Sequence, residues 1–233
     1  MRDSSCWQRC PVLVPGLTSP VRRRQHHSSS SSAALAKLHY IYATMNAGKS
    51  TLLLQAAYNY QERGMRVAML ISALDNRAGK GFIGSRIGLR AEATAFGQEA
   101  DLFTAIKADH DASRLSCVFV DEAQFLTTEQ VWQLARVVDS LDIPVMAYGL
   151  RTDFRGELFP GSKALLAIAD ELTEARSICH CGRKATMVVR VGEDGKAQRD
   201  GAQVLIGGNE TYTSLCRRHW QLAFAADEVT GNT

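Results

Sequence analysis

Short apolar runs alternate with amphipathic stretches along most of this chain. Near-continuous apolar runs are typical of strands buried on both faces, and they occur at residues 38–42, 67–72, 117–120 and 144–149. A shorter run predicts a further strand at 91–96. Apolar spacing of the helical period predicts helices that begin near residue 48, over 99–109 and over 127–141, the last with a hydroxyl cap at Thr127. This alternation indicates an α/β fold, with a parallel sheet covered by helices on both faces.

The pattern changes after residue 149. A polar and aromatic loop is expected over 150–161, then a helix over 162–168, two β-like segments at 186–191 and 203–206, a loop at 207–212, and a closing helix at 216–226. We therefore expect an α/β domain followed by a smaller one. The predicted divisions are an N-terminal extension at 1–36, an α/β domain at 37–175, a small domain at 176–226 and a C-terminal tail at 227–233.

The composition is that of a globular protein, with 45% hydrophobic and 22% charged residues among 233. No apolar run reaches the length of a membrane span, so no membrane partner is expected. The net charge of +3 is small, and much of it lies near the N-terminus, so the charge indicates no nucleic-acid partner.

Residues 1–36 differ from the rest. They are rich in arginine and serine, with Asp3 as their one acid, and are predicted to be disordered. Their composition resembles that of a transit peptide, but we favour a species-specific extension or a start codon assigned too early. A secretory apolar segment is lacking, and we expect a cytoplasmic protein.

The turn after the first strand carries the strongest chemical signal. Residues 43–51 read ATMNAGKST and place Lys49-Ser50 between a buried strand and a helix start. This layout is that of a P-loop, in which backbone N–H groups and the helix dipole face phosphate oxygens. Lys49 is expected to reach the β- and γ-phosphates, and the Ser50 hydroxyl to contact Mg²⁺. The usual first glycine is replaced by Ala43, so the loop entry departs from the common form.

Two adjacent carboxylates end the third strand. Asp121 and Glu122 form a Walker B arrangement, in which Asp121 would hold Mg²⁺ and Glu122 would accept a proton from an attacking oxygen. Because a glutamate here also serves ATPases, the pair indicates nucleoside triphosphate chemistry without specifying a kinase. The polar, glycine-rich segment 75–81 follows the second strand and is expected to be a surface loop near this site. Candidates for further positive charge at the site, or for structural ion pairs, are Arg86, Arg151 and Arg155.

A second cluster of chemistry lies near the C-terminus. Three sulfurs and one imidazole nitrogen are typical of tetrahedral structural zinc, and the candidate ligands are Cys179, Cys181, Cys216 and His219. Without a secretion signal, metal is a better interpretation than disulfides. His180 is a rival ligand, but adjacent side chains rarely converge on one metal. Zinc would close the polar segment 182–215 and let it cover a small ligand. Cys117 is expected to fill the core, and Cys6 and Cys10 to be incidental.

Four motifs, in this order, resemble the thymidine kinase family of the type with a zinc-bearing lasso domain. They are MNAGKST (45–51), DEAQF (121–125), CHCGRK (179–184) and IGGNETY (206–212). The likeness covers about residues 38–219, nearly everything but the N-terminal extension. Bacterial members share the Cys-x-Cys spacing and a P-loop that begins without glycine, which accounts for Ala43.

The resemblance implies a RecA-like P-loop NTPase fold with an added lasso domain. It implies transfer of the ATP γ-phosphoryl group to the 5′-hydroxyl of thymidine, and of deoxyuridine, to make dTMP in pyrimidine deoxynucleoside salvage. The implied cofactors are Mg²⁺ and structural Zn²⁺. A homotetramer is expected, with dTTP as a feedback inhibitor.

The motifs also imply residue roles. Glu122 is the expected general base. The expected ATP-binding residues are Ala43, Thr44, Met45, Asn46, Ala47, Gly48, Lys49, Ser50, Asp121, Glu122, Ala123 and Gln124. The expected substrate-binding residues are Phe125, Phe154, Gln203, Val204, Leu205, Ile206, Gly207 and Tyr212, with residues 203–207 bonding the thymine ring through their backbone.

Two other classes of protein share parts of this pattern. One is a P-loop ATPase with a nucleic-acid-binding zinc ribbon. The lack of a prominent basic face in the sequence argues against this class. The other is a binding module whose zinc ribbon grips DNA, with weak support from Arg217-Arg218. Such a module would not need Lys49 or Glu122.

Overall fold

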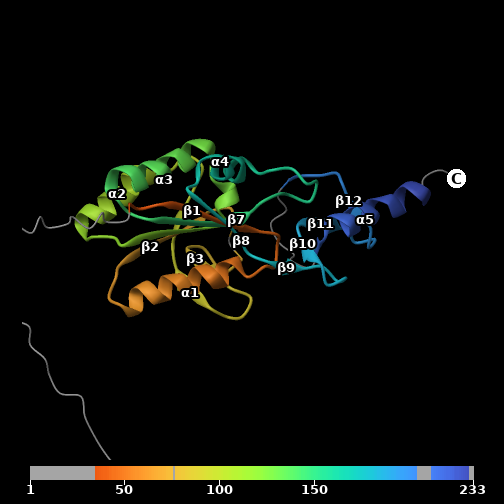
Figure 1. The fold of residues 1–233 in the computed structure, drawn as a ribbon, viewed down its shortest axis with the longest axis horizontal. Helices are drawn as coiled ribbons and strands as arrows, with labels where there is room; N and C mark the ends of the chain where they lie inside the picture. The colour runs from red at the N-terminus through yellow and green to blue at the C-terminus, as the bar shows by residue number, and fades with distance from the viewer. Residues whose placement is uncertain (1–34, 76, 204–210, 231–233) are drawn as a thin grey trace, which may run out of the picture. The chain divides into compact units, whose positions relative to one another are not determined.

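The computed structural model describes residues 35–75, 77–203 and 211–230 (Figure 1). For residues 226–230 it describes the backbone alone. Most of the predicted N-terminal extension, the predicted thymine-binding residues Val204, Leu205, Ile206 and Gly207, and the last three residues lie outside these ranges.

The main sheet has six parallel strands in the order β5-β2-β6-β7-β1-β8. They are β1 (Leu38–Ala43), β2 (Val67–Ser72), β5 (Thr94–Phe96), β6 (Cys117–Asp121), β7 (Val145–Leu150) and β8 (Glu171–Glu174). All five residues of β6 are buried, as the unbroken apolar run predicts. The carboxyl ends of β1, β2 and β6 lie at one edge of the sheet, so the loops that follow them meet there.

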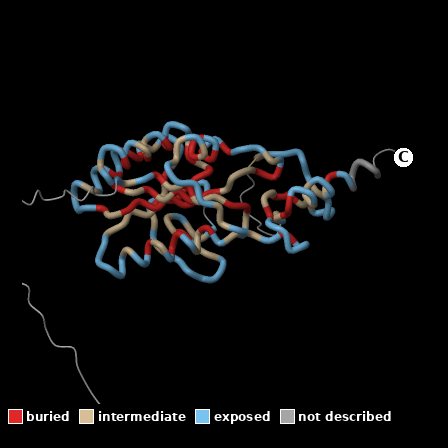
Figure 2. The backbone as a smooth tube through the Cα atoms, in the orientation of Figure 1, coloured by how far each residue is buried: buried red, intermediate tan, exposed pale blue. Residues whose placement is uncertain are grey.

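Helices cover both faces of this sheet (Figure 1). One face carries α1 (Lys49–Glu62), and the other carries α2 (Leu102–Ala112), α3 (Thr128–Leu141) and α4 (Pro160–Ile168). Buried positions accordingly concentrate along the central strands (Figure 2). The hydroxyl cap expected at Thr127 is present as a capping box with Gln130, which satisfies N–H groups at the start of α3. The α/β fold with a covered parallel sheet is therefore confirmed.

Two short strands flank α1. They are β3 (Phe82–Gly84) and β4 (Arg90–Glu92), which pair antiparallel, and Ile83 is fully buried among residues of α1 and the sheet. The predicted strand at 91–96 is in fact two strands, because its first residues belong to β4 and its last to β5. The short 3₁₀ helix η1 (Ala123–Phe125) follows β6.

The C-terminal part has its own small core. Its strands are β9 (Ser177–Ile178), β10 (Lys184–Ala185), β11 (Met187–Val191), β12 (Ala197–Gln198) and β13 (Tyr212–Leu215), and the chain ends in α5 (Arg217–Thr230). β11 lies between β12 and β13 in an antiparallel sheet. The six buried residues of this core include two cysteines, Cys179 and Cys216. Across the described ranges, the structure contains no helix of the length and apolar character that a membrane span requires.

Candidate active site

The loop between β1 and α1 is shaped by left-handed backbone. Asn46 and Gly48 have φ of 64° and 78°, and Gly48 is the N-cap of α1 with no side-chain hydrogen bond to the helix. The first N–H groups of a helix have no intrahelical partner, so this loop leaves donors available at the positive end of α1. The strand–loop–helix geometry predicted from the sequence is therefore present.

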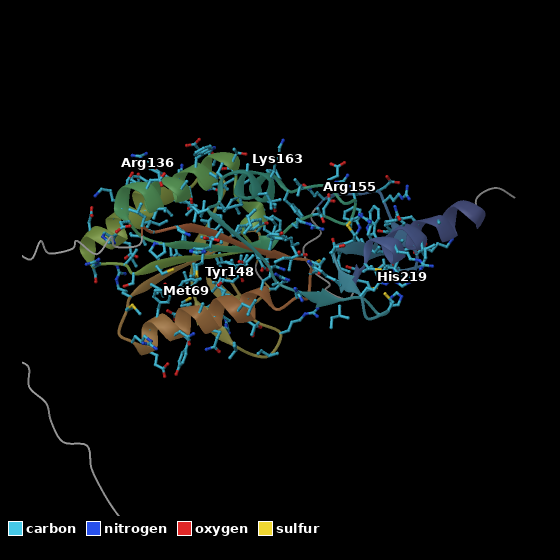
Figure 3. The ribbon with its side chains drawn as sticks, viewed as in Figure 1. Met69, Arg136, Tyr148, Arg155, Lys163 and His219 are labelled. Carbon is cyan, nitrogen blue, oxygen red and sulfur yellow. The ribbon has the colours of Figure 1, made fainter. Side chains whose placement is uncertain are left out.

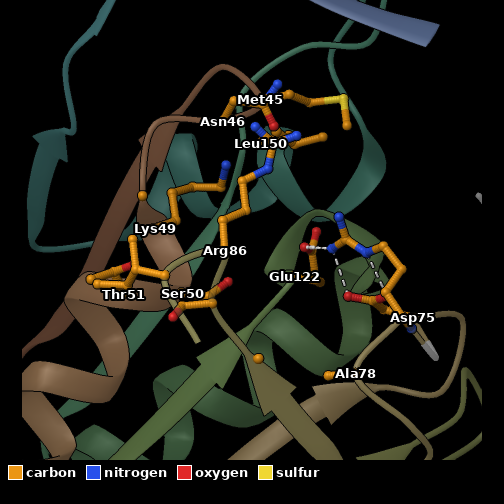
Figure 4. Close-up of a pocket in the computed structure, with 15 residues that line it drawn as sticks. Met45, Asn46, Lys49, Ser50, Thr51, Asp75, Ala78, Arg86, Glu122 and Leu150 are labelled. Atoms are coloured by element: carbon orange, nitrogen blue, oxygen red, sulfur yellow. Dashed lines mark hydrogen bonds and ion pairs between the residues drawn. The ribbon is translucent and has the colours of Figure 1, made fainter. Parts of the chain in front are cut away.

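A cavity of about 490 Å³ opens at this loop (Figure 4). Its lining comes from the loop, the start of α1 and the ends of neighbouring strands, and comprises Met45, Asn46, Gly48, Lys49, Ser50, Thr51, Asp75, Arg77, Ala78, Gly84, Ser85, Arg86, Ile87, Glu122 and Leu150. Of the predicted ATP-binding residues, Ala43, Thr44, Ala47, Asp121, Ala123 and Gln124 lie outside this lining.

Lys49 places a buried positive charge in this cavity. Its side chain Nζ donates to the Thr44 carbonyl at 3.0 Å, and none of the ion pairs among described residues includes it. Burial lowers the pKa of Lys49, although the nearby Glu122 and Asp121 carboxylates act in the opposite direction. A buried cation without a carboxylate partner favours an anionic ligand.

Asp121 lies beside the start of α1. Its carboxylate accepts hydrogen bonds from the Ser50 side chain and, at 3.0 Å, from the Glu122 backbone N–H. Burial and repulsion by Glu122 raise its pKa to about 7. A hydroxyl next to a buried carboxylate is a pair of hard oxygen donors, which suits Mg²⁺. These two residues could therefore hold that ion, which would neutralise charge on bound phosphates.

Glu122 is held in an unusual conformation. Its φ of 52° and ψ of 40° are left-handed, which costs a non-glycine residue free energy and is often found at functional sites. Its carboxylate pairs with the Arg77 guanidinium, which also pairs with Asp75 at 2.7 Å, as the dashed lines in Figure 4 show. Burial acts to raise the pKa of Asp75, but the hydrogen bonds and positive charge of Arg77 outweigh it, so the Asp75 pKa is lowered.

Gln124 supports Glu122 through a second hydrogen bond. Its side-chain amide donates to the other Glu122 oxygen at 2.5 Å, while its own oxygen accepts from the Leu150 N–H at 3.0 Å. A Cβ at Gly149 would lie 2.9 Å from the Gln124 backbone nitrogen, so glycine allows β7 and η1 to approach closely. Glu122 is thus oriented from two sides and presents its carboxylate to the cavity.

Arg77 was not given a role by sequence reasoning. The segment 75–81 was expected near the site, and this expectation is confirmed for Asp75, Arg77 and Ala78. The available signal was a charged residue just past the end of a strand. Among the other arginine candidates, Arg86 lines the cavity, whereas Arg151 donates to the Thr186 carbonyl at 2.8 Å.

The predicted nucleoside contacts that the structure describes lie outside the cavity lining. The rings of Phe125 and Phe159 pack edge to face, with centroids 6.0 Å apart. Phe154 is buried, Tyr212 is half-buried at the start of β13, and the Gln203 side chain donates to Asp153 at 3.1 Å. Arg155, the third arginine candidate, pairs with Asp153 at 3.4 Å.

The four predicted zinc ligands converge. The ligand atoms of Cys179, Cys181, Cys216 and His219 all lie within 4.8 Å of one another, with His219 on α5 (Figure 3). His219 Nδ1 is 3.4 Å and 3.5 Å from the sulfurs of Cys179 and Cys216, and the Cys181 and Cys216 sulfurs are 3.9 Å apart. Zinc bonds of ~2.0–2.3 Å in a tetrahedron give edges of about 3.3–3.8 Å, so the spacing fits zinc.

The charge state of the cluster also suits a metal. Although burial acts in the opposite direction, hydrogen bonds from the backbone at Cys181 and Cys216 and from His219 lower the pKa of the Cys179 thiol to about 6. Metals bind the thiolate, so this environment prepares a ligand. The rival ligand His180 stacks on His219, with ring centroids 4.3 Å apart, and is not part of the converging group.

Together, this fold and site define an α/β protein with a strand–loop–helix unit that carries a buried lysine, an acidic pair at the end of β6, and a separate Cys/His cluster that could bind zinc. A family model described as thymidine kinase matches residues 36–220, and the chain belongs to the thymidine kinase family.

Curated relatives agree over nearly their whole length. The chain is 70% identical to the thymidine kinase of Rhizobium meliloti (strain 1021) over 188 residues, which are 80% of this chain and 96% of the relative. It is 64% identical to that of Jannaschia sp. (strain CCS1), covering 81% and 97%, and 54% identical to that of Escherichia coli (strain K12), covering 84% and 96%.

Proposed function

We propose that this protein transfers the γ-phosphoryl group of ATP to the 5′-hydroxyl of thymidine, and also of deoxyuridine, and so makes dTMP for pyrimidine deoxynucleoside salvage. The observation that supports this most directly is the buried, unpaired Lys49 charge in the same cavity as the Glu122 carboxylate. A cation for phosphate and a base for a hydroxyl are the two groups that phosphoryl transfer between these substrates needs.

The proposed roles follow from the positions of the side chains. Lys49 and the N–H groups at the start of α1 bind the β- and γ-phosphates. Ser50 and Asp121 hold Mg²⁺, which supplies charge neutralisation when bound. Glu122 accepts the proton of the 5′-hydroxyl as the hydroxyl oxygen bonds to the γ-phosphorus, while the bond from the γ-phosphorus to the β,γ-bridging oxygen breaks and ADP leaves. Arg77, which pairs with Glu122, adds positive charge at the cavity and orients that carboxylate.

The remaining expectations belong to the same proposal. The C-terminal part, 176–226, acts as a small domain closed by one zinc on Cys179, Cys181, Cys216 and His219, beside an α/β domain at 37–175. Residues 203–207, Phe125, Phe154 and Tyr212 bind the nucleoside. Ala43, Thr44, Ala47, Ala123 and Gln124 support the ATP site. The enzyme works as a cytoplasmic homotetramer that dTTP inhibits.

The names of the relatives favour this proposal over a P-loop ATPase with a nucleic-acid-binding zinc ribbon. A phosphorylation assay with ATP and Mg²⁺ over thymidine, deoxyuridine, deoxycytidine and purine deoxynucleosides distinguishes them. We expect labelled monophosphate from the first two nucleosides, and loss of activity in Lys49→Met. ATP hydrolysis that nucleic acid stimulates, without thymidine phosphorylation, would overturn the proposal.

A further inference from the structure

Arg190, on β11, carries a buried guanidinium that no carboxylate pairs with in the described part of the chain. Its partners are uncharged. One terminal nitrogen donates to the Ala202 carbonyl at 2.9 Å, and the other donates to the Asp200 carbonyl. The guanidinium carbon lies 4.0 Å from the centre of the Phe154 ring, and Nε has no hydrogen-bond partner.

Burying a guanidinium without a carboxylate partner lowers the free energy of unfolding. Arginine keeps its proton in proteins, so the charge cannot be relieved by titration. A buried N–H without a partner adds a further penalty, and an apolar side chain of similar size would cost less. Arginine makes directional contacts that an apolar side chain cannot make. Its planar guanidinium bonds two carbonyls in a fixed geometry, while its face stacks on an aromatic ring.

The groups that Arg190 contacts come from separate parts of the chain. Asp200 and Ala202 lie just before Gln203 in the sequence. Tyr212 is the cross-strand neighbour of Arg190 in the pairing of β11 with β13. Arg190 therefore bonds Ala202, pairs across the sheet with Tyr212, and stacks its guanidinium on the Phe154 ring.

Gly201 shows how closely the chain wraps the guanidinium. Its φ of 109° is in the region that favours glycine, and a Cβ at this position would lie 2.4 Å from a terminal nitrogen of Arg190. The backbone of residues 200–202 therefore packs closely against the Arg190 side chain. Gln203 is fixed next to it by its 3.1 Å hydrogen bond to Asp153, the neighbour of Phe154 in the chain.

We propose that Arg190 is a positioning residue for the nucleoside, which sets thymidine affinity by holding Phe154 and the backbone of 200–202 in register with Tyr212. It acts through these groups and does not touch the substrate. The inference rests on the proposed function, because Phe154, Gln203 and Tyr212 are the nucleoside contacts that the motifs imply.

The test compares Arg190→Met, which keeps the length and removes the charge, with Arg190→Lys, which keeps the charge and lacks the fork. We expect Arg190→Met to raise the KM for thymidine about 10-fold or more, as the loss of one or two charge-assisted hydrogen bonds predicts, while the KM for ATP changes less than about two-fold. Arg190→Lys should recover a part of the loss at most. Equal changes in both KM values, or no change, would overturn the proposal.

A second measurement needs no substrate. Hydrogen exchange of the backbone amides at 199–203 should be faster in Arg190→Met than in the wild type, with the zinc content unchanged. Arg183→Met, at an exposed arginine of the same part of the chain, is the matched control and should change neither reading. Unchanged exchange in both Arg190 variants would refute the proposed role.

The two proposals fail separately. A wild type that does not phosphorylate thymidine contradicts the proposed function, whereas the exchange measurement still decides whether Arg190 holds residues 200–202. Should Arg190→Met not fold, the same readings on Arg190→Lys decide the question, because lysine keeps the charge and most of the volume.

Discussion

The Ser214 hydroxyl donates a hydrogen bond to the Met45 carbonyl at 2.7 Å, between residues 169 positions apart in the sequence. Ser214 is on β13, next to the Cys/His cluster, and Met45 belongs to the loop that lines the cavity before α1. The bond ties the C-terminal part of the chain directly to the proposed phosphate loop. A substitution that destabilises β13 should therefore also weaken ATP binding at the proposed site.

We expect Ser214→Ala to weaken both stability and ATP binding. The Met45 carbonyl loses its donor, so the free energy of unfolding should fall by ~0.5–1.5 kcal/mol, and the KM for ATP should rise several-fold. Urea unfolding and steady-state kinetics measure the two effects. Thr213→Ala is the matched control, because the Thr213 side chain is exposed on the same strand. Equal losses in both variants would show that this hydrogen bond has no special role.

Glu122→Gln should lower kcat by roughly 10²–10⁴-fold, the usual contribution of a general base. The amide can still accept the hydrogen bond from Gln124, so the KM for ATP should change little. Rapid-quench measurement of the phosphoryl-transfer step tests this directly. An exposed carboxylate, Glu99, offers the control variant Glu99→Gln, which should retain full turnover. Near-normal turnover in Glu122→Gln would remove this residue as the base.

Metal analysis of the purified protein should give about one zinc per chain. Cys216→Ser removes a sulfur that lies 3.5 Å from His219 Nδ1, so this variant should lose the metal. Its C-terminal part should then unfold at a lower urea concentration than the α/β sheet. Cys117→Ala, at a buried cysteine outside the cluster, should keep its zinc. A fully loaded Cys216→Ser variant would mean that the ligand set is different.

Stability should fall at high pH, and Cys117 should account for part of the fall. Burial raises the pKa of this thiol from 9.0 to about 12, although hydrogen bonding with Tyr60 and with the Val118 backbone acts in the opposite direction. Its stabilising contribution is complete below pH 9 and is lost as the pH rises toward 12, because only the unfolded chain then releases the proton.

The pH experiment compares urea unfolding of the wild type with that of Cys117→Ala across this range. The fall should be shallower in the variant. Burial also raises the pKa of Tyr148 to about 12, so a fall of the same sign remains in both proteins. Parallel pH profiles for the wild type and the variant would contradict the assignment to Cys117.

Elements with a strong local pattern were the ones that could be predicted. The central strands are buried on both faces, so each reads as an unbroken apolar run, and the Thr127 cap is a signal within one turn of helix. In contrast, β8 has the polar sequence ELTE and was missed. It lies at the edge of the sheet, where it pairs only with β1, and an exposed edge strand has no need of apolar residues.

Short-range patterns in the amino-acid sequence identify the candidate chemical groups of this protein. Lys49, the Asp121-Glu122 pair and the cysteine motifs are short-range patterns, because a loop before a helix or two residues at the end of a strand have their geometry fixed by neighbours in the chain. Which distant groups contact these residues depends instead on how the whole chain folds. Arg77 reaches Glu122, Ser214 reaches Met45, and Arg190 reaches Phe154 because strand order and core packing bring these segments together. No local pattern encodes those contacts, since each depends on the path of the whole chain between the partners.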